Sequence, residues 1–150
     1  MSVEKIDRKI SVIFATDVVD YSLHMEKDES GTVTSLRTYE KILKQAFKKH
    51  GGRLFNTAGD SFMAEFSSAV KAVECAIDFQ NIVKEKNIKP ALSFRIGINA
   101  GDVILQKKNL LGDGVNVAAR LEQLSQPDGC LLYTSPSPRD LSTSRMPSSA

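Results

Sequence analysis

Hydrophobic positions in the first third of the chain follow two different periods. Residues 10–15 form a short apolar run rich in β-branched side chains, which is typical of a buried strand. Residues 18–25 then indicate a short helix or turn. From residue 32 to residue 47 apolar side chains recur every three or four positions, which predicts an amphipathic helix, and Gly51-Gly52 supplies its end.

The next segment predicts a hairpin and a second helix. Residues 53–57 and 61–66 are two strand-like runs around the turn Ala58-Gly59-Asp60. Ser67 or Ser68 is suited to cap the helix that follows. The apolar residues of that helix are Val70, Val73, Ile77 and Val83.

The second half predicts three further strands and one helix. Residues 92–98 alternate between apolar and polar, which indicates a strand with one apolar face. Residues 103–106 indicate a separate strand after Gly101. A glycine-rich turn then opens a helix over residues 115–124, and residues 129–133 indicate a last strand.

The order of these elements predicts an α+β fold. A strand, a helix, a hairpin, a helix, a hairpin, a helix and a strand suit a sandwich with a mainly antiparallel sheet and helices on one face. A ferredoxin-like βαββαβ unit is the natural core of that class. We expect residues 1–8 to be an N-terminal extension and residues 9–132 to form the domain.

The final segment, residues 133–150, does not fit this domain. Eleven of the last seventeen residues are Ser, Thr or Pro. Such a composition buries too little apolar surface to offset the entropy of ordering the chain. The segment is either a disordered tail or non-native, because its run Tyr-Thr-Ser-Pro-Ser-Pro-Arg-Asp resembles translated adaptor or vector sequence.

Composition excludes several classes of protein. The chain is 41% hydrophobic and 25% charged, as in ordinary globular domains, and its net charge of +2 is too small to indicate nucleic-acid binding. Its two cysteines form no CxxC pair, so we expect neither a disulfide framework nor a zinc site. No apolar stretch approaches the ~20 residues of a membrane span. We therefore expect a cytoplasmic fragment without membrane contact.

Two carboxylates stand where strand-like runs end. Asp17 follows the first strand, and Asp60 lies in the hairpin turn. If those strands are neighbours, both side chains point into one cleft. Mg²⁺ and Mn²⁺ prefer oxygen ligands, and two such ions can assist a displacement at phosphorus. Either aspartate alone is better explained as a turn residue.

Asn116 and Arg120 are four residues apart on a predicted helix and therefore share one face. The guanidinium of an arginine suits phosphate oxygens, and the amide of an asparagine suits a ribose oxygen. Taken alone, a pair at this spacing is by default part of a solvent-facing helix surface.

Four segments together resemble the class III adenylate and guanylate cyclases. They occur in the order of that family and at about its spacings, and the resemblance extends from about residue 9 to residue 132. The segments are residues 14–22, 51–60, 94–101 and 112–122.

The resemblance implies a metal and phosphate site. Asp17 and Asp60 match the carboxylates that bind two Mg²⁺ or Mn²⁺ ions per site, and the backbone carbonyl of Val18 matches the group that joins them. The following turn matches the segment that cradles the substrate phosphates. It comprises Val19, Asp20, Tyr21 and Ser22.

The resemblance also implies catalysis by a homodimer. Asn116 matches the residue that orients the ribose, and Arg120 matches the residue that stabilises the charged transition state. In the family these two come from the partner subunit. The implied reaction converts ATP, or GTP, into a 3′,5′-cyclic nucleotide and pyrophosphate for intracellular signalling.

Three features depart from the family pattern. Asn56 and Asn109 stand where the base-reading residues are expected, and they match neither the adenylate nor the guanylate pattern, although we favour ATP. Asp20 replaces a glycine of the phosphate turn, and we expect its carboxylate to point away from the phosphates. The lysine expected for the terminal phosphates has no match after Leu132.

Two alternatives follow from these departures. One is a catalytically inactive module that keeps the fold for dimerisation or regulation. The other is a different two-metal phosphoryl-transfer enzyme, such as a polymerase-palm relative that makes a dinucleotide.

Overall fold

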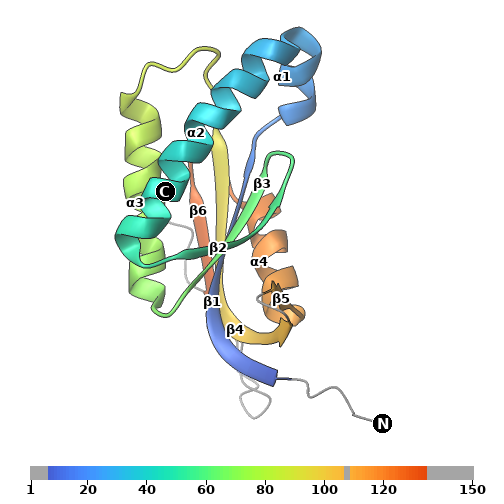
Figure 1. The fold of residues 1–150 in the computed structure, drawn as a ribbon, viewed down its shortest axis with the longest axis vertical. Coiled ribbons are helices and arrows are strands. Elements are labelled where there is room, and N and C mark those ends of the chain that lie inside the picture. The colour runs from blue at the N-terminus through green and yellow to red at the C-terminus, as the bar shows by residue number, and fades with distance from the viewer. Residues whose placement is uncertain (1–6, 107–108, 135–150) are drawn as a thin grey trace.

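A six-stranded sheet and four helices make up the described part of the chain, residues 7–106 and 109–134 of the computed structural model (Figure 1). The strands are β1 (Asp7–Val18), β2 (Arg53–Ala58), β3 (Ser61–Phe66), β4 (Phe94–Gln106), β5 (Asn109–Leu111) and β6 (Cys130–Thr134). The helices are α1 (Tyr21–Lys27), α2 (Glu29–His50), α3 (Ala69–Glu85) and α4 (Asp113–Leu124).

The sheet has the strand order β2-β3-β1-β4-β5, and β6 also pairs with β4. The β1, β2, β3 and β4 strands with α2 and α3 form the expected ferredoxin-like βαββαβ unit. All described pairings are antiparallel apart from that of β4 with β6. The α+β class with a mainly antiparallel sheet is confirmed.

Local signals set the ends of the two long helices. The carboxylate of Asp28 caps α2 by accepting a hydrogen bond from the Gly31 N–H at 3.0 Å. Gly51 ends the helix with φ 80°, a left-handed conformation that favours glycine. Ser68 caps α3 by accepting from the Lys71 N–H at 3.3 Å.

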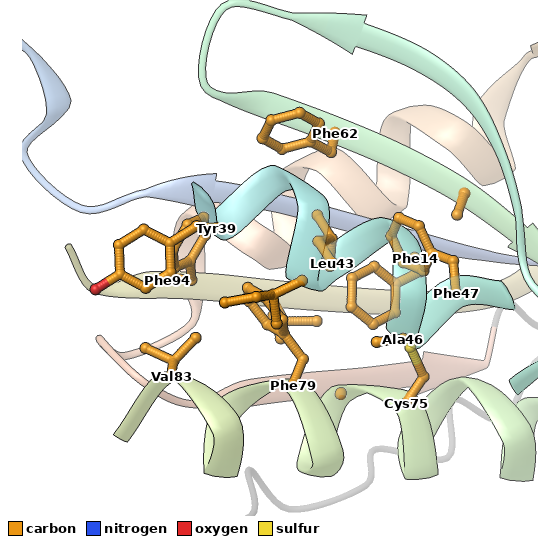
Figure 2. Packing of buried hydrophobic residues seen from close by; sticks show 14 of the residues in the cluster. Phe14, Tyr39, Leu43, Ala46, Phe47, Phe62, Cys75, Phe79, Val83 and Phe94 are labelled. Carbon is orange, nitrogen blue, oxygen red and sulfur yellow. The ribbon is translucent and has the colours of Figure 1, made fainter. Parts of the chain in front are cut away.

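The α2 and α3 helices cover one face of the sheet with an aromatic core (Figure 2). The rings of Phe14 and Phe47 meet edge to face with centroids 5.1 Å apart, and those of Phe79 and Phe94 do the same at 5.1 Å. Both Phe14 on β1 and Phe94 on β4 are fully buried. This core fixes the two central strands whose ends carry the candidate site.

The α4 helix packs on the opposite face, where Ile13 and Ala15 of β1 contact Val115 and Ala118 (Figure 1). The expectation that helices lie on one face therefore holds for α2 and α3, and α4 departs from it. The parallel strands β4 and β6 need a crossover connection. That connection contains α4 and runs over the face that α2 and α3 leave open.

Two local expectations were wrong. Residues 92–98 and 103–106 do not form separate strands, because β4 runs through Gly101, which pairs with Ser11 of β1. On α3, Val70 and Ile77 are 66% and 56% exposed. The helix instead buries Ala72, Cys75, Ala76, Phe79, Gln80 and Val83.

Within the described residues, no helix combines the length and apolarity required to cross a membrane. The expected N-terminal extension, residues 1–8, and the expected tail, residues 133–150, lie almost entirely outside the described ranges.

Candidate active site

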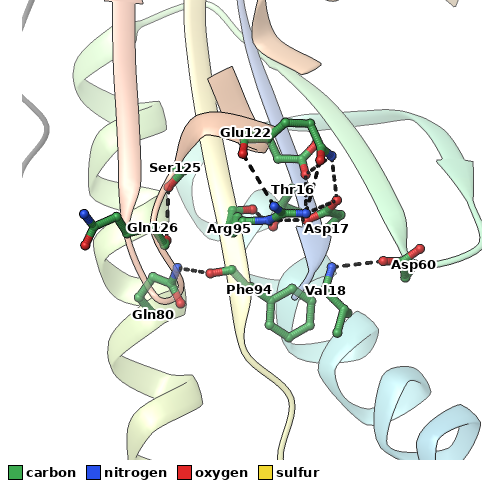
Figure 3. A network of polar contacts seen from close by, with 11 residues as sticks. Thr16, Asp17, Val18, Asp60, Gln80, Phe94, Arg95, Glu122, Ser125 and Gln126 are labelled. Atoms are coloured by element: carbon green, nitrogen blue, oxygen red, sulfur yellow. Dashed lines mark hydrogen bonds and ion pairs between the residues drawn. The ribbon is translucent and has the colours of Figure 1, made fainter. Parts of the chain in front are cut away.

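Asp17 lies next to Arg95 because β1 and β4 pair with these two residues in register. Both side chains point to the α4 face of the sheet (Figure 3). Nε of Arg95 donates to Oδ1 of Asp17 at 3.1 Å, and Nη2 donates to Oδ2 at 3.0 Å. This two-point contact is the strong geometry of an arginine–carboxylate pair. The hydrogen bond to Asp17 is the main cause that raises the pKa of Arg95, against the effect of burial.

The last turn of α4 adds two polar side chains to this pair. Nε2 of Gln123 donates to Oδ2 of Asp17 at 2.8 Å and to Oε1 of Glu122 at 2.9 Å. Oε1 of Gln123 accepts from Nη2 of Arg95 at 3.3 Å. Glu122 is only 3% exposed, and burial together with its hydrogen bond to Asp17 raises its pKa to about 9.

Asp60 reaches the end of β1 from the β2–β3 hairpin. Its Oδ2 accepts a hydrogen bond from the Val18 N–H at 3.1 Å (Figure 3). Gly59 takes φ 59° in the hairpin turn. Burial raises the pKa of Asp60, the hydrogen bond from Val18 opposes this, and the negative charge of Asp17 raises it further. The carboxylates expected to share a site are therefore close enough to interact electrostatically.

The two carboxylates match the donor chemistry of a hard divalent cation, and the oxygens of Asp17 already accept hydrogen bonds from Arg95 and Gln123. Two carboxylates around one backbone segment supply the oxygen donors that Mg²⁺ and Mn²⁺ prefer. Among the residues that the structure describes, no group of three or more His, Cys, Asp or Glu side chains is placed to hold a metal. Any further ligands would therefore be backbone, water or substrate oxygens, as is common for Mg²⁺.

The segment after Val18 makes a tight turn into α1. The Val19 N–H donates to the Ser93 carbonyl at 2.8 Å, which fixes the start of the turn. Asp20 is exposed and has φ 54° and ψ 40°, in the left-handed region. This conformation gives a physical reason for a glycine at that position. Tyr21 packs against the main core, whereas Ser22 is exposed.

Asn116 and Arg120 are both exposed on α4. Among the described residues, the hydrogen bonds and ion pairs link neither of them to Asp17 or Asp60. Arg120 instead lines an open, mainly apolar groove of about 520 Å³ between α4 and β6. Its other lining residues are Val117, Leu121, Leu124, Leu131, Leu132 and Tyr133.

The structure places the two candidate base-reading residues on strands but shows less of their surroundings. Asn56 is exposed on β2, directly after an irregularity in the pairing of β2 with β3. Asn109 begins β5, and its side chain lies outside the described part of the chain.

Sequence reasoning missed three residues of this site, namely Arg95, Glu122 and Gln123. Arg95 carries a usable signal, because it is a charged residue between two apolar residues of a strand, Phe94 and Ile96. The contact of Glu122 and Gln123 with Asp17 carries no such signal, since 106 residues separate Gln123 from Asp17.

The fold and the sequence together define a nucleotidyl cyclase catalytic domain. A family model described as "Adenylate and Guanylate cyclase catalytic domain" matches residues 2–135, and the chain belongs to this family.

Relatives by sequence agree with this assignment. The chain is 42% identical over 134 residues to "Putative adenylate cyclase 3" of Rhizobium meliloti (strain 1021), which covers 86% of the chain and 23% of that protein. It is 30% identical over 134 residues to an "Adenylate cyclase" of Streptomyces coelicolor, covering 87% of the chain and 34% of that protein. The chain thus spans about a quarter to a third of the length of these two relatives.

Solved structures show the same fold. The crystal structure titled "Adenylate/Guanylate Cyclase/Hydrolase" from Silicibacter pomeroyi matches with a TM-score of 0.76 and 33% identity, covering 85% of this chain and 77% of that one. The adenylyl cyclase CyaB from P. aeruginosa matches with a TM-score of 0.75 and 23% identity, covering 86% and 79%, and this likeness concerns the fold alone.

Proposed function

We propose that this chain is the catalytic part of a nucleotidyl cyclase that converts a nucleoside triphosphate, ATP in preference to GTP, into a 3′,5′-cyclic nucleotide and pyrophosphate. The reaction would serve intracellular signalling in the cytoplasm. The observation that carries the proposal is the hydrogen bond from the Val18 N–H to Asp60. It holds the hairpin carboxylate at the end of β1, where the negative charge of Asp17 raises the pKa of Asp60.

Asp17, Asp60 and the Val18 carbonyl would hold two Mg²⁺ or Mn²⁺ ions per site. When bound, such cations lower the pKa of an attacking hydroxyl and neutralise phosphate charge. The turn of residues 19–22 would lie along the phosphates. The exposed carboxylate of Asp20 would face solvent there, since like charges repel.

The bond changes define the roles of the remaining residues. The 3′-oxygen of the ribose forms a bond to the α-phosphorus, and the bond from that phosphorus to the bridging oxygen of pyrophosphate breaks. Asn116 would orient the ribose through its amide. Arg120 would meet the charge that builds on the phosphorus centre, and donors of this kind lower a barrier by about 3–4 kcal/mol. We assign no protein side chain to accept the 3′-proton.

A homodimer would bring the cation-binding residues of one subunit together with Asn116 and Arg120 of the other. Asn116 and Arg120 make no described contact with Asp17 or Asp60 of their own chain, so a second copy is the natural source of the pair. The apolar groove beside Arg120 supports an interface at α4. Two such sites would form in each dimer, one from each combination of halves.

The preference for ATP rests on the names of two relatives and on the hydrogen-bonding chemistry of amide side chains. The relatives from Rhizobium meliloti and Streptomyces coelicolor are both named adenylate cyclases. The amides of Asn56 and Asn109 are able to complement either base by rotating half a turn. Asn56→Ala should therefore raise KM for ATP and change the ratio of ATP to GTP use.

Mixing two inactive variants tests the shared site. Asp17→Ala and Arg120→Ala should each lose cyclic nucleotide formation with Mn²⁺ and ATP, identified by mass spectrometry of the product. Random mixing should restore about a quarter of the wild-type rate, because half of the dimers would hold one intact site. Absence of recovery, with both variants folded and dimeric, would count against the shared site.

A second candidate is an inactive module of the same fold. The left-handed Asp20 and the engaged state of Asp17 favour it. A wild-type protein that binds nucleotide yet makes no cyclic product with either ATP or GTP would support this alternative.

A further inference from the structure

The carboxylate of Asp17 is already engaged by its own chain. Its two oxygens receive three N–H donors: Nε and Nη2 of Arg95, and Nε2 of Gln123. The side chains of Asp17 and Arg95 are only 13% and 22% exposed, so water screens this ion pair poorly. A carboxylate offers about four lone-pair positions, and most of those of Asp17 are therefore occupied.

A cation at Asp17 would meet both a filled carboxylate and a fixed positive charge. The guanidinium lies 3.0 Å from the oxygen that a cation would need. Coordination by that oxygen therefore requires Arg95 to withdraw from at least one of the two atoms that it binds.

The α4 helix offers the withdrawn guanidinium other acceptors. Nη1 of Arg95 already donates to the Gln123 carbonyl at 3.5 Å, and Nη2 lies 3.3 Å from Oε1 of Gln123 and 3.9 Å from Oε1 of Glu122. A small rotation of the guanidinium toward α4 would thus keep its N–H groups hydrogen-bonded to oxygen acceptors, which makes the release feasible in a half-buried site.

We propose that Arg95 is a positioning residue that latches Asp17 in the cation-free protein, and that cation binding moves its guanidinium from Asp17 to the acceptors on α4. This inference rests on the proposed function, because it takes Asp17 to be a cation ligand. It also links the cation site to α4, the helix that carries Asn116 and Arg120 on its exposed side.

Direct Mn²⁺ binding tests the latch without any measurement of activity. Free Mn²⁺ is counted by electron paramagnetic resonance in titrations of the 150-residue protein and its variants. Arg95→Gln should bind Mn²⁺ about tenfold more tightly than wild type, because it removes the competing charge. Arg95→Lys keeps that charge and should stay within about threefold of wild type. Arg53→Gln is the matched control, since Arg53 pairs with Glu65 instead, and it should leave the affinity unchanged.

Asp17→Asn separates failure of the latch from failure of the proposed function. It should abolish tight Mn²⁺ binding. If it does so while folded Arg95→Gln binds no more tightly than wild type, the latch is refuted and the cation site stands. If neither wild type nor Arg95→Gln binds Mn²⁺, both the cation site and the latch are refuted.

A measurement on the wild-type protein keeps the test independent of how the variants fold. The Nε–H resonance of Arg95, assigned by its loss in Arg95→Lys or by triple-resonance experiments, is followed during a Mg²⁺ titration. Its chemical shift should change in step with Mg²⁺ occupancy, because the hydrogen bond to Oδ1 of Asp17 is lost or weakened. Saturation with Mg²⁺ at an unchanged Nε–H shift would overturn the proposal.

Discussion

Gly97 of β4 lies directly against the backbone of Glu122 in the last turn of α4. A Cβ atom at this position would overlap the Glu122 backbone nitrogen and lie 2.7 Å from the Ala118 carbonyl oxygen. The missing side chain therefore allows α4 to approach the sheet closely. This approach brings Gln123 within hydrogen-bond distance of Asp17.

Gly97→Ala should destabilise the protein by about 3 kcal/mol, because the added methyl group meets backbone rather than a flexible side chain. It should also disturb the contact between Gln123 and Asp17. Denaturant unfolding checks the stability. Gly59→Ala is the comparison: no atom lies within 4 Å of its Cβ position, so only left-handed strain applies, about 1 kcal/mol. Equal losses in the two variants would contradict the close approach of α4.

Asp60→Asn should lose cyclase activity by at least about a hundredfold and keep its fold. The asparagine carbonyl still accepts the Val18 N–H, so the hairpin stays anchored. Because burial raises the pKa of Asp60, the folded state disfavours its charge, and the neutral variant should be as stable as wild type or slightly more so. A Mn²⁺-dependent activity assay checks the loss of activity, and thermal unfolding checks the stability. A clear drop in melting temperature would contradict the expectation that the neutral side chain keeps the hairpin anchored to Val18.

Glu65 should make the stability of the fold sensitive to acid. Burial raises the pKa of Glu65, but its hydrogen bonds with Arg53 and Lys9 outweigh this, and the net pKa lies below the ordinary 4.5. The contribution is therefore present above about pH 4.5 and is lost as pH falls through the lower, folded-state pKa. Its size should be about 1 kcal/mol or less, since both cations are 43% exposed.

Glu65→Gln should be less stable than wild type at pH 7 and nearly equal to it at pH 3. Urea unfolding at the two pH values measures the difference. A difference in the free energy of unfolding between the two proteins that grew larger at pH 3 would contradict the prediction.

Asp20→Gly should raise stability by about 0.5–1 kcal/mol, because glycine adopts φ 54° without strain. Asp128→Gly is a matched control, since Asp128 has φ 62° on the segment between α4 and β6. Both variants should unfold at higher temperature, but only Asp20→Gly should lower KM for the nucleotide, because it removes a negative charge from the proposed phosphate turn. A change in KM of similar size in Asp128→Gly would remove this role of Asp20.

The candidate carboxylates were predictable from the sequence, whereas their surroundings were not. Asp17 follows an apolar run and Asp60 lies in a turn between two short strands, and both signals are local. The structure brings both to the end of β1. Arg95 occupies a polar position of an alternating strand, but its pairing with Asp17 depends on the register of β1 against β4. Register is set by pairing over the whole strand and is invisible in any short window.

The predictions of strand boundaries and of helix faces failed for a related reason. Gly101 indicated a break, yet β4 continues because β1 pairs with it along twelve positions, from Asp7 to Val18. Val70 and Ile77 lie at helical spacing but face solvent, since the small residues Ala72 and Ala76 allow α3 to pack closely on the aromatic core. Apolar character alone does not say which face of a helix the neighbouring elements leave room for.

The sequence by itself determined most element types, helix-end signals such as Gly51 and Ser68, and the family to which the chain belongs, because periodicity, capping residues and motifs are properties of neighbouring residues. Only the tertiary structure decided that α4 covers the second face of the sheet and that Asp60 hydrogen-bonds to the end of β1. It also decided that Arg95 donates hydrogen bonds to the carboxylate of Asp17. Each of these depends on contacts between segments distant along the chain, and the packing of the whole sheet selects them together.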